Sequence, residues 1–108
     1  MSNAIPKSRL PHTVVQNAYT DGSRGGSYGA NTTINNVKVD EAKVLRTNKE
    51  GKEIVGNATM FYDYVNSTSA TFNLEDKITF KDRTYRIVDI EILYANSNDP
   101  HHYEITLQ

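Results

Sequence analysis

The apolar residues of this chain recur at every second position in one segment after another. In the C-terminal stretch HYEITL, Tyr103, Ile105 and Leu107 share one parity, and the residues between them are polar. Successive side chains of a β-strand point to opposite faces, so this period predicts half-buried strands rather than helices. The pattern therefore favours an all-β fold.

Several such segments follow one another, separated by short turns rich in Gly, Asn and Asp. The expected strands cover residues 12–19, 32–42, 43–46, 53–65, 76–80, 84–94 and 102–107. Polar loops of a few residues are typical of antiparallel hairpins. Only residues 73–77 suggest a helix, as a single turn capped by Asn73. We expect a small antiparallel β-barrel or sandwich of six to seven strands, with one domain over residues 12–108 and a flexible N-terminal arm over residues 1–11.

One expected strand changes the face on which its apolar residues lie. Tyr85 and Ile87 share one parity, whereas Val88 and Ile90 have the other. A strand cannot exchange its buried face without an extra residue or a bend. The sequence therefore predicts a bulge near residues 87–89.

The glycine-rich segment TDGSRGGSYGANTT raises the question of a phosphate-binding loop. Four of the six glycines of the chain fall within residues 22–29. A phosphate loop of the Walker type ends in Gly-Lys-Ser/Thr before a helix, whereas this cluster ends in Gly-Ala-Asn before an expected strand. We therefore expect no nucleotide site, and interpret residues 20–31 as a long flexible loop joining the first two strands.

Composition argues against several functional classes. The 108 residues carry 12 basic and 13 acidic side chains, without the basic excess that is typical of nucleic-acid binders. The absence of cysteine excludes disulfides and thiol nucleophiles. No apolar run approaches the roughly 20 residues that span a bilayer. We expect neither a membrane protein nor a tight DNA binder.

No constellation of residues supports catalysis, a metal or a cofactor. His101 and His102 are adjacent, and neighbouring strand residues point to opposite faces, so we expect one exposed and one packed histidine. The acidic pairs at residues 40–41 and 75–76 are interpreted as solvated turn formers, because catalytic carboxylates need a cleft and separated environments. We expect no enzyme and no cofactor.

The seven tyrosines of the chain leave an alternative open. Small β-barrels can stack single-stranded bases on exposed aromatic rings. Most of these tyrosines share the parity of aliphatic residues, which favours packing in the core or at a subunit interface. The alternative function is a binding module for single-stranded nucleic acid or a peptide.

Several stretches, taken in order, resemble the minor capsid proteins of tailed bacteriophages and prophages, within the head-completion or head–tail joining group. They are IPKSRLPHTV, VKVDEAKVLRTNKEGKEIVGNATMFYDYVNS, LEDKITFKDRTYRIVDIEILY and HHYEITL. The usual Gly-Asp of that group appears here as Glu75-Asp76, and its turn glycine appears as Asp82. The resemblance covers nearly the whole chain from Ile5 onward.

The resemblance implies a structural role in the virion at the connector between head and tail. Such proteins assemble in the host bacterial cytoplasm as rings that complete the head, extend or close the DNA channel and dock the tail. The expected partners are further copies of the chain, a portal or adaptor protein and tail proteins, while DNA passes without sequence-specific binding. We expect the contacts to come from the N-terminal arm, the glycine-rich loop and one hairpin tip, with these residues as candidates: Arg24, Gly25, Gly26, Tyr28, Lys49 and Glu50.

Overall fold

The computed structural model describes residues 4–22, 25–94 and 100–108, and within them it is an antiparallel β structure. A short 3-10 helix is followed by eight strands: η1 (Lys7–Arg9), β1 (His12–Thr20), β2 (Ser27–Asp40), β3 (Val44–Thr47), β4 (Glu53–Gly56), β5 (Ala58–Asp63), β6 (Lys77–Phe80), β7 (Arg83–Tyr94) and β8 (Pro100–Leu107). The prediction of an all-β fold is confirmed. Among the described residues, no helix is long and apolar enough to cross a membrane.

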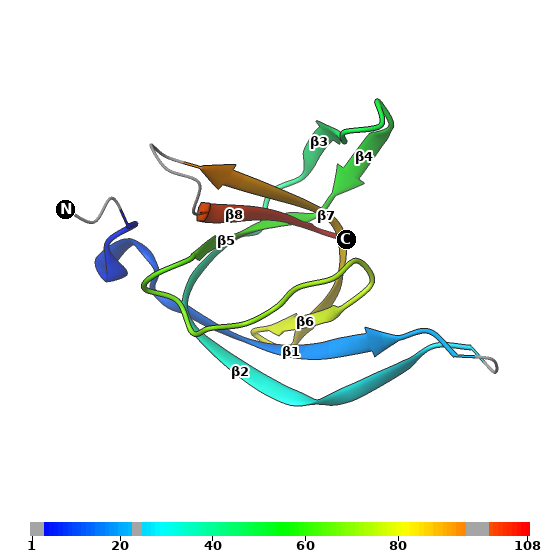
Figure 1. Ribbon diagram of the computed structural model, residues 1–108, viewed down its shortest axis with the longest axis horizontal. Helices are drawn as coiled ribbons and strands as arrows, with labels where there is room; N and C mark the ends of the chain where they lie inside the picture. Colours follow the sequence, from blue (N-terminus) through cyan, green and yellow to red (C-terminus); the bar gives the residue numbers. More distant parts are fainter. Residues whose placement is uncertain (1–3, 23–24, 95–99) are drawn as a thin grey trace.

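Six of the strands close into a barrel in the order β1-β2-β5-β8-β7-β6, with β6 pairing back to β1. Figure 1 shows β3 and β4 as a separate hairpin that stands beside the barrel, over β5, β7 and β8. Closure removes most of the unpaired strand edges that an open sheet exposes.

The interior of the barrel is filled by side chains that alternate inward along its strands. The largest fully buried apolar side chains come from different strands around the barrel: Val14, Ile34, Val37, Met60, Ile78, Ile87, Ile105 and Leu107. The predicted inward face of β8 is therefore confirmed at its C-terminal end. β5 ends at Asp63, and the side chain of the next residue, Tyr64, is half exposed.

The segment predicted as one strand over residues 53–65 is divided in two at Asn57. Its first part, β4, leaves the barrel to pair with β3, and its second part, β5, lies in the barrel wall. Gly56 lies at the division, where an added Cβ would come within 2.4 Å of Thr106 Cγ2 and 2.9 Å of Val44 Cγ1. Only glycine, which lacks a Cβ, fits so close to these side chains. The contact covers the outer face of β8 at Thr106, which is fully buried.

The predicted bulge in β7 is confirmed. Ile87 pairs with Leu107 and Asp89 pairs with Thr106, so Val88 is the extra residue between them. The turn that joins β6 to β7 has the backbone geometry of a tight antiparallel hairpin. Lys81 and Asp82 both have positive φ, of 48° and 66°, as in the two-residue turns that match the twist of β-strands.

Three segments pack differently from what the sequence suggested. Residues 4–11 of the expected N-terminal arm contact the barrel, because the Ile5 amide donates to Asp63 Oδ1 at 2.8 Å and Leu10 is 2% exposed. Burial of an apolar side chain is worth about 1.5–3 kcal/mol, which favours docking of this segment. The helical turn expected at Asn73 is a β-turn, and the second acid of the 75–76 pair is completely buried rather than solvated.

Candidate functional site

Beyond the barrel wall, β1 and β2 continue as a two-stranded ribbon, which we define as residues 18–22 and 25–31. The pairing of β1 with β6 ends at Asn17, and the pairing of β2 with β5 begins at Val37. Figure 1 shows the ribbon projecting to the right of the barrel, along the 48 Å long axis.

The prediction of a long flexible loop is therefore wrong in the range that it gave, residues 20–31. Asn31 pairs with Asn17, Tyr28 with Tyr19, and Ser27 with Thr20. Strand pairing supplies partners for backbone groups that an extended loop would leave to water, and β2 begins at Ser27 instead of at residue 32.

The tip of the ribbon is tightly built. Gly22 and Gly25 exchange both backbone hydrogen bonds, at 3.2 and 3.1 Å, and Gly25 has a φ of 100° that side chains disfavour. An added Cβ at Gly26 would lie 2.0 Å from the Tyr19 ring, so that ring lies over the glycine. Tyr28 meets the Tyr19 ring edge-on at 5.6 Å and is 47% exposed.

Of the predicted contact residues, the structure therefore places Gly25, Gly26 and Tyr28 together at the ribbon tip. Arg24 lies outside the described residues. Lys49 and Glu50 lie elsewhere, in the turn between β3 and β4, where Asn48 Oδ1 accepts hydrogen bonds from the amides of Glu50 and Lys52. Figure 1 shows this turn and the ribbon as two separate projections, so the candidates do not form one site.

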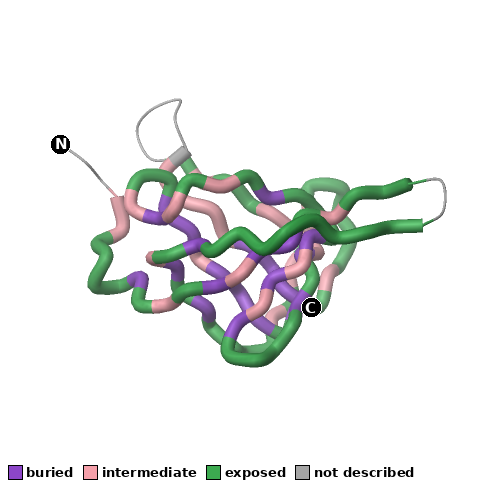
Figure 2. Tube along the Cα trace, turned by 90° about the horizontal axis from the view of Figure 1, so that it is seen from below, coloured by how far each residue is buried: buried purple, intermediate pink, exposed green. Residues whose placement is uncertain are grey.

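The ribbon has a feature that sequence reasoning missed, which is an unprotected edge. Within the described residues, the part of β2 over residues 27–34 has β1 on one edge and no strand on the other. Neither β1 nor residues 27–37 contain Asp, Glu, Lys, Arg or Pro, the residues with which proteins usually block edge pairing. Figure 2 shows the outer part of the ribbon as exposed on both strands.

The backbone groups of this edge point outward at alternate residues. At its inner end, the amide and carbonyl of Asn35 both bond to Thr68, on the side away from β1. Because the backbone direction repeats every second residue, the amides and carbonyls of Thr33 and Asn31 point to the same side, where no strand follows. The uncharged alternation of residues 27–37 could have suggested this edge, but its lack of a partner could not be read from the sequence.

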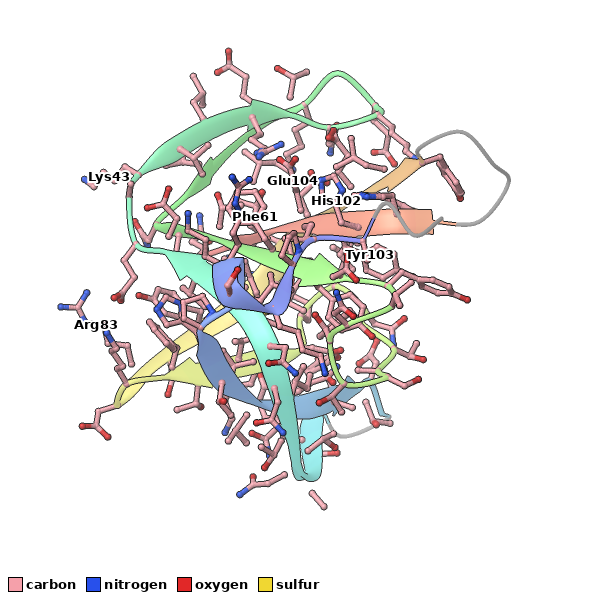
Figure 3. The ribbon with its side chains drawn as sticks, turned by 90° about the vertical axis from the view of Figure 1, so that its left-hand side faces the viewer. Lys43, Phe61, Arg83, His102, Tyr103 and Glu104 are labelled. Atoms are coloured by element: carbon pink, nitrogen blue, oxygen red, sulfur yellow. The ribbon has the colours of Figure 1, made fainter. Side chains whose placement is uncertain are left out.

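A polar cluster joins the β3–β4 hairpin to the barrel. Arg46 Nη2 donates to Glu104 Oε1 at 2.7 Å, and His102 Nε2 lies 3.4 Å from Glu104 Oε2. Figure 3 shows Glu104 and His102 on the side of β8 that faces the hairpin, with Tyr103 on the other side. Burial alone would raise the pKa of Glu104, but the hydrogen bonds from Arg46 and His102 outweigh it and the pKa lies below its usual value.

We expect this contact to weaken in acid. A carboxyl with a lowered pKa in the folded state contributes stability above its unfolded-state pKa, and that contribution is lost as the pH falls through the folded pKa. Glu104→Gln should lower the free energy of unfolding by about 1–2 kcal/mol at pH 7, and by progressively less below pH ~4.5. Urea unfolding of both proteins from pH 7 to pH 3 measures the difference, and a difference that is constant with pH would contradict the assignment.

The two adjacent histidines differ from expectation. Both are partly buried, and their Nδ1 atoms lie 2.8 Å apart, instead of one ring being packed and the other exposed. Within the described part of the chain, no group of three or more His, Cys, Asp or Glu side chains is arranged to hold a metal ion.

These features define a small β-barrel whose exposed groups are suited to contacts with other protein chains. The family model described as minor capsid protein matches residues 6–107, and the chain belongs to that family. It is therefore a structural component of a bacteriophage virion. No curated protein and no solved structure matches the chain.

Proposed function

We propose that this minor capsid protein acts at the head–tail connector, as a ring of identical copies that completes the head, extends or closes the DNA channel and docks the tail. The proposed partners are a portal or adaptor protein on the head side and tail proteins on the other side. Assembly takes place in the host cytoplasm, DNA passes through without sequence-specific binding, and the protein has no catalytic part in the process.

The free edge of the ribbon is the observation that carries the proposal. An isolated two-stranded ribbon is marginally stable in water, and an uncharged open edge is a template for a further strand. Pairing that edge with a neighbouring copy would protect it, and a contact between two different surfaces generates a ring when its rotation closes. Lys49 and Glu50, on the hairpin tip, and Arg24 remain candidates for the contacts above and below the ring.

The test is a proline at a position whose amide points to the free edge. Thr33→Pro removes one outward N–H, and proline is tolerated on an edge strand when that N–H faces solvent. We expect Thr33→Pro to fold with a loss of at most about 1 kcal/mol, because no bond to β1 is removed. We also expect it to abolish rings in electron micrographs of the purified protein and to leave heads without joined tails in a complementation assay.

The matched control is Thr33→Val, which keeps the amide and the branched shape of the side chain. We expect it to form rings and to support infectious particles like the wild-type protein. Normal rings and normal head–tail joining with Thr33→Pro would overturn the proposed role of the edge. A wild-type protein that is absent from the connector of purified virions would overturn the proposed function itself.

A further inference from the structure

An aromatic patch lies at the end of the barrel away from the ribbon. The rings of Tyr62, Phe72 and Tyr103 pack together inside this end, with centroids 4.9, 5.3 and 6.4 Å apart. Figure 3, which views the molecule from this end, shows Tyr103 on β8. Two further tyrosines lie next to this part of β8: the Tyr64 amide donates to the His101 carbonyl at 3.2 Å, and Tyr94 pairs with Pro100.

The apolar lining of the barrel continues from these rings to the surface. Ile90 pairs with Ile105 and Ile92 pairs with Tyr103 on the inward face of β7 and β8, yet Ile92 is 39% exposed. Tyr64 and Tyr94 are 50% and 56% exposed, and Val65, which follows Tyr64 in the turn after β5, is 64% exposed. We call these four residues the aromatic mouth: Tyr64, Val65, Ile92 and Tyr94.

The mouth lies beside a second free strand edge. The pairing of β7 with β6 ends at Arg86, and the backbone of Ile87 bonds to the turn that precedes β6. From Val88 to Tyr94, β7 has β8 on one edge and, in the described residues, no strand on the other. Apolar surface and unpaired backbone are therefore available at the same place.

We propose that the aromatic mouth and the adjacent edge of β7 receive the ribbon of a second copy of this chain. This inference rests on the proposed ring and names the surface that the ribbon contacts. Figure 1 shows the ribbon and the tips of β5 and β7 at opposite ends of the long axis, as a head-to-tail contact between copies requires.

The strand residues of the ribbon match the mouth in chemistry. Residues 18–20 and 27–31 carry no Asp, Glu, Lys or Arg, and the mouth consists of two tyrosines, a valine and an isoleucine, so these side chains bury no charge when they meet. Asp21, beside the tip, is exposed. Two half-exposed tyrosines offer on the order of 200 Å² of contact, about a quarter of what one partner buries in a standard interface. Strand pairing along the ribbon adds further contact area. Tyrosines are also enriched among the residues that dominate the binding energy of interfaces.

The absence of cysteine in the chain makes a direct test possible. A protein carrying both Tyr28→Cys and Tyr94→Cys should form a ladder of disulfide-linked multimers under mild oxidation at ring-forming concentrations. The matched control carries Tyr28→Cys and Leu45→Cys, because Leu45 is 63% exposed but lies on β3, away from the mouth. We expect little cross-linking in the control, and equal cross-linking in both proteins would overturn the proposal.

A charge in the mouth gives an independent measurement. Val65 and Leu45 are almost equally exposed, at 64% and 63%, so Val65→Glu and Leu45→Glu disturb the fold to a similar extent. We expect Val65→Glu to weaken self-association at least about tenfold by sedimentation, and Leu45→Glu to leave it within about twofold. Both variants should melt within a few degrees of wild type.

The outcomes separate this inference from the proposed function. Wild-type rings together with normal rings from Val65→Glu would overturn the mouth as the contact surface and leave the connector role intact. Wild-type protein that forms no rings and is absent from connectors would overturn both. Binding of oligothymidylate that quenches tyrosine fluorescence and is lost in Tyr94→Ala would assign the mouth to single-stranded nucleic acid instead.

Discussion

Asp76→Ala is expected to lower the free energy of unfolding by about 3–5 kcal/mol, a large part of the total stability of a domain of this size. The side chain of Asp76 is completely buried and accepts hydrogen bonds from Gln16 Nε2, from the Tyr19 amide and from the Asn73 amide, at 2.8, 2.8 and 2.9 Å. Alanine would leave these donors without their acceptor inside the protein, and each buried unsatisfied donor costs about 1–3 kcal/mol.

The residue beside it provides the control. Glu75 forms an ion pair with Arg86 at 3.1 Å, but both side chains are about half exposed. Exposed ion pairs contribute at most about 1 kcal/mol, so Glu75→Ala should change stability little. Urea unfolding at neutral pH compares the two variants. A loss below about 1 kcal/mol for Asp76→Ala would show that these hydrogen bonds do not hold the barrel to the base of the ribbon.

Asp63→Ala should have the second-largest effect, about 3 kcal/mol, with a local consequence as well. The buried carboxylate accepts from the amides of Val65 and Asn66 in the turn after β5, at 2.9 and 2.7 Å, and from the Ile5 amide at 2.8 Å. The substitution therefore breaks the turn and frees the N-terminal segment, which Asp63 holds against the barrel.

Limited proteolysis measures the local consequence. Trypsin should cleave after Arg9 in Asp63→Ala faster than in the wild-type protein, because release exposes the peptide bond before the buried Leu10. Asp40→Ala is the control, since Asp40 is an exposed carboxylate at the end of β2. Equal cleavage rates in all three proteins would refute the anchoring role of Asp63, whatever the change in stability.

The buried carboxylates of Asp76 and Asp63 could not be predicted from local sequence patterns. Residues 75–76 look like an acidic turn, and Asp63 lies in a tyrosine-rich strand, so neither position signals a buried charge. Asp76 is buried because Gln16 and Tyr19, which are distant from it in the sequence, lie beside it in the fold and donate hydrogen bonds to it. Asp63 is buried because the N-terminal segment packs against it and the Ile5 amide donates to it. A buried carboxylate is stable only where such donors converge, and convergence is a property of the fold.

The candidate site was predicted only in part. The sequence indicated Gly25, Gly26 and Tyr28 as contact-capable, and they lie together at an exposed tip. It did not indicate the ordered ribbon behind them, because polar residues such as Ser27 and Asn31 have no apolar alternation to mark a strand. The aromatic mouth was also missed, because Tyr64 and Tyr94 share the parity of core residues and are exposed only where the strands run past the closed part of the barrel.

The sequence by itself determined most of the strands and hairpins and a bulge near residues 87–89, because side-chain alternation and turn chemistry act over a few neighbouring residues. Its order of motifs also resembled the family to which the chain belongs. Only the tertiary structure decided which strand edges stay open. An edge is free when no other strand reaches it, and that depends on how β6, β7 and β8 close the barrel around residues far apart in the chain.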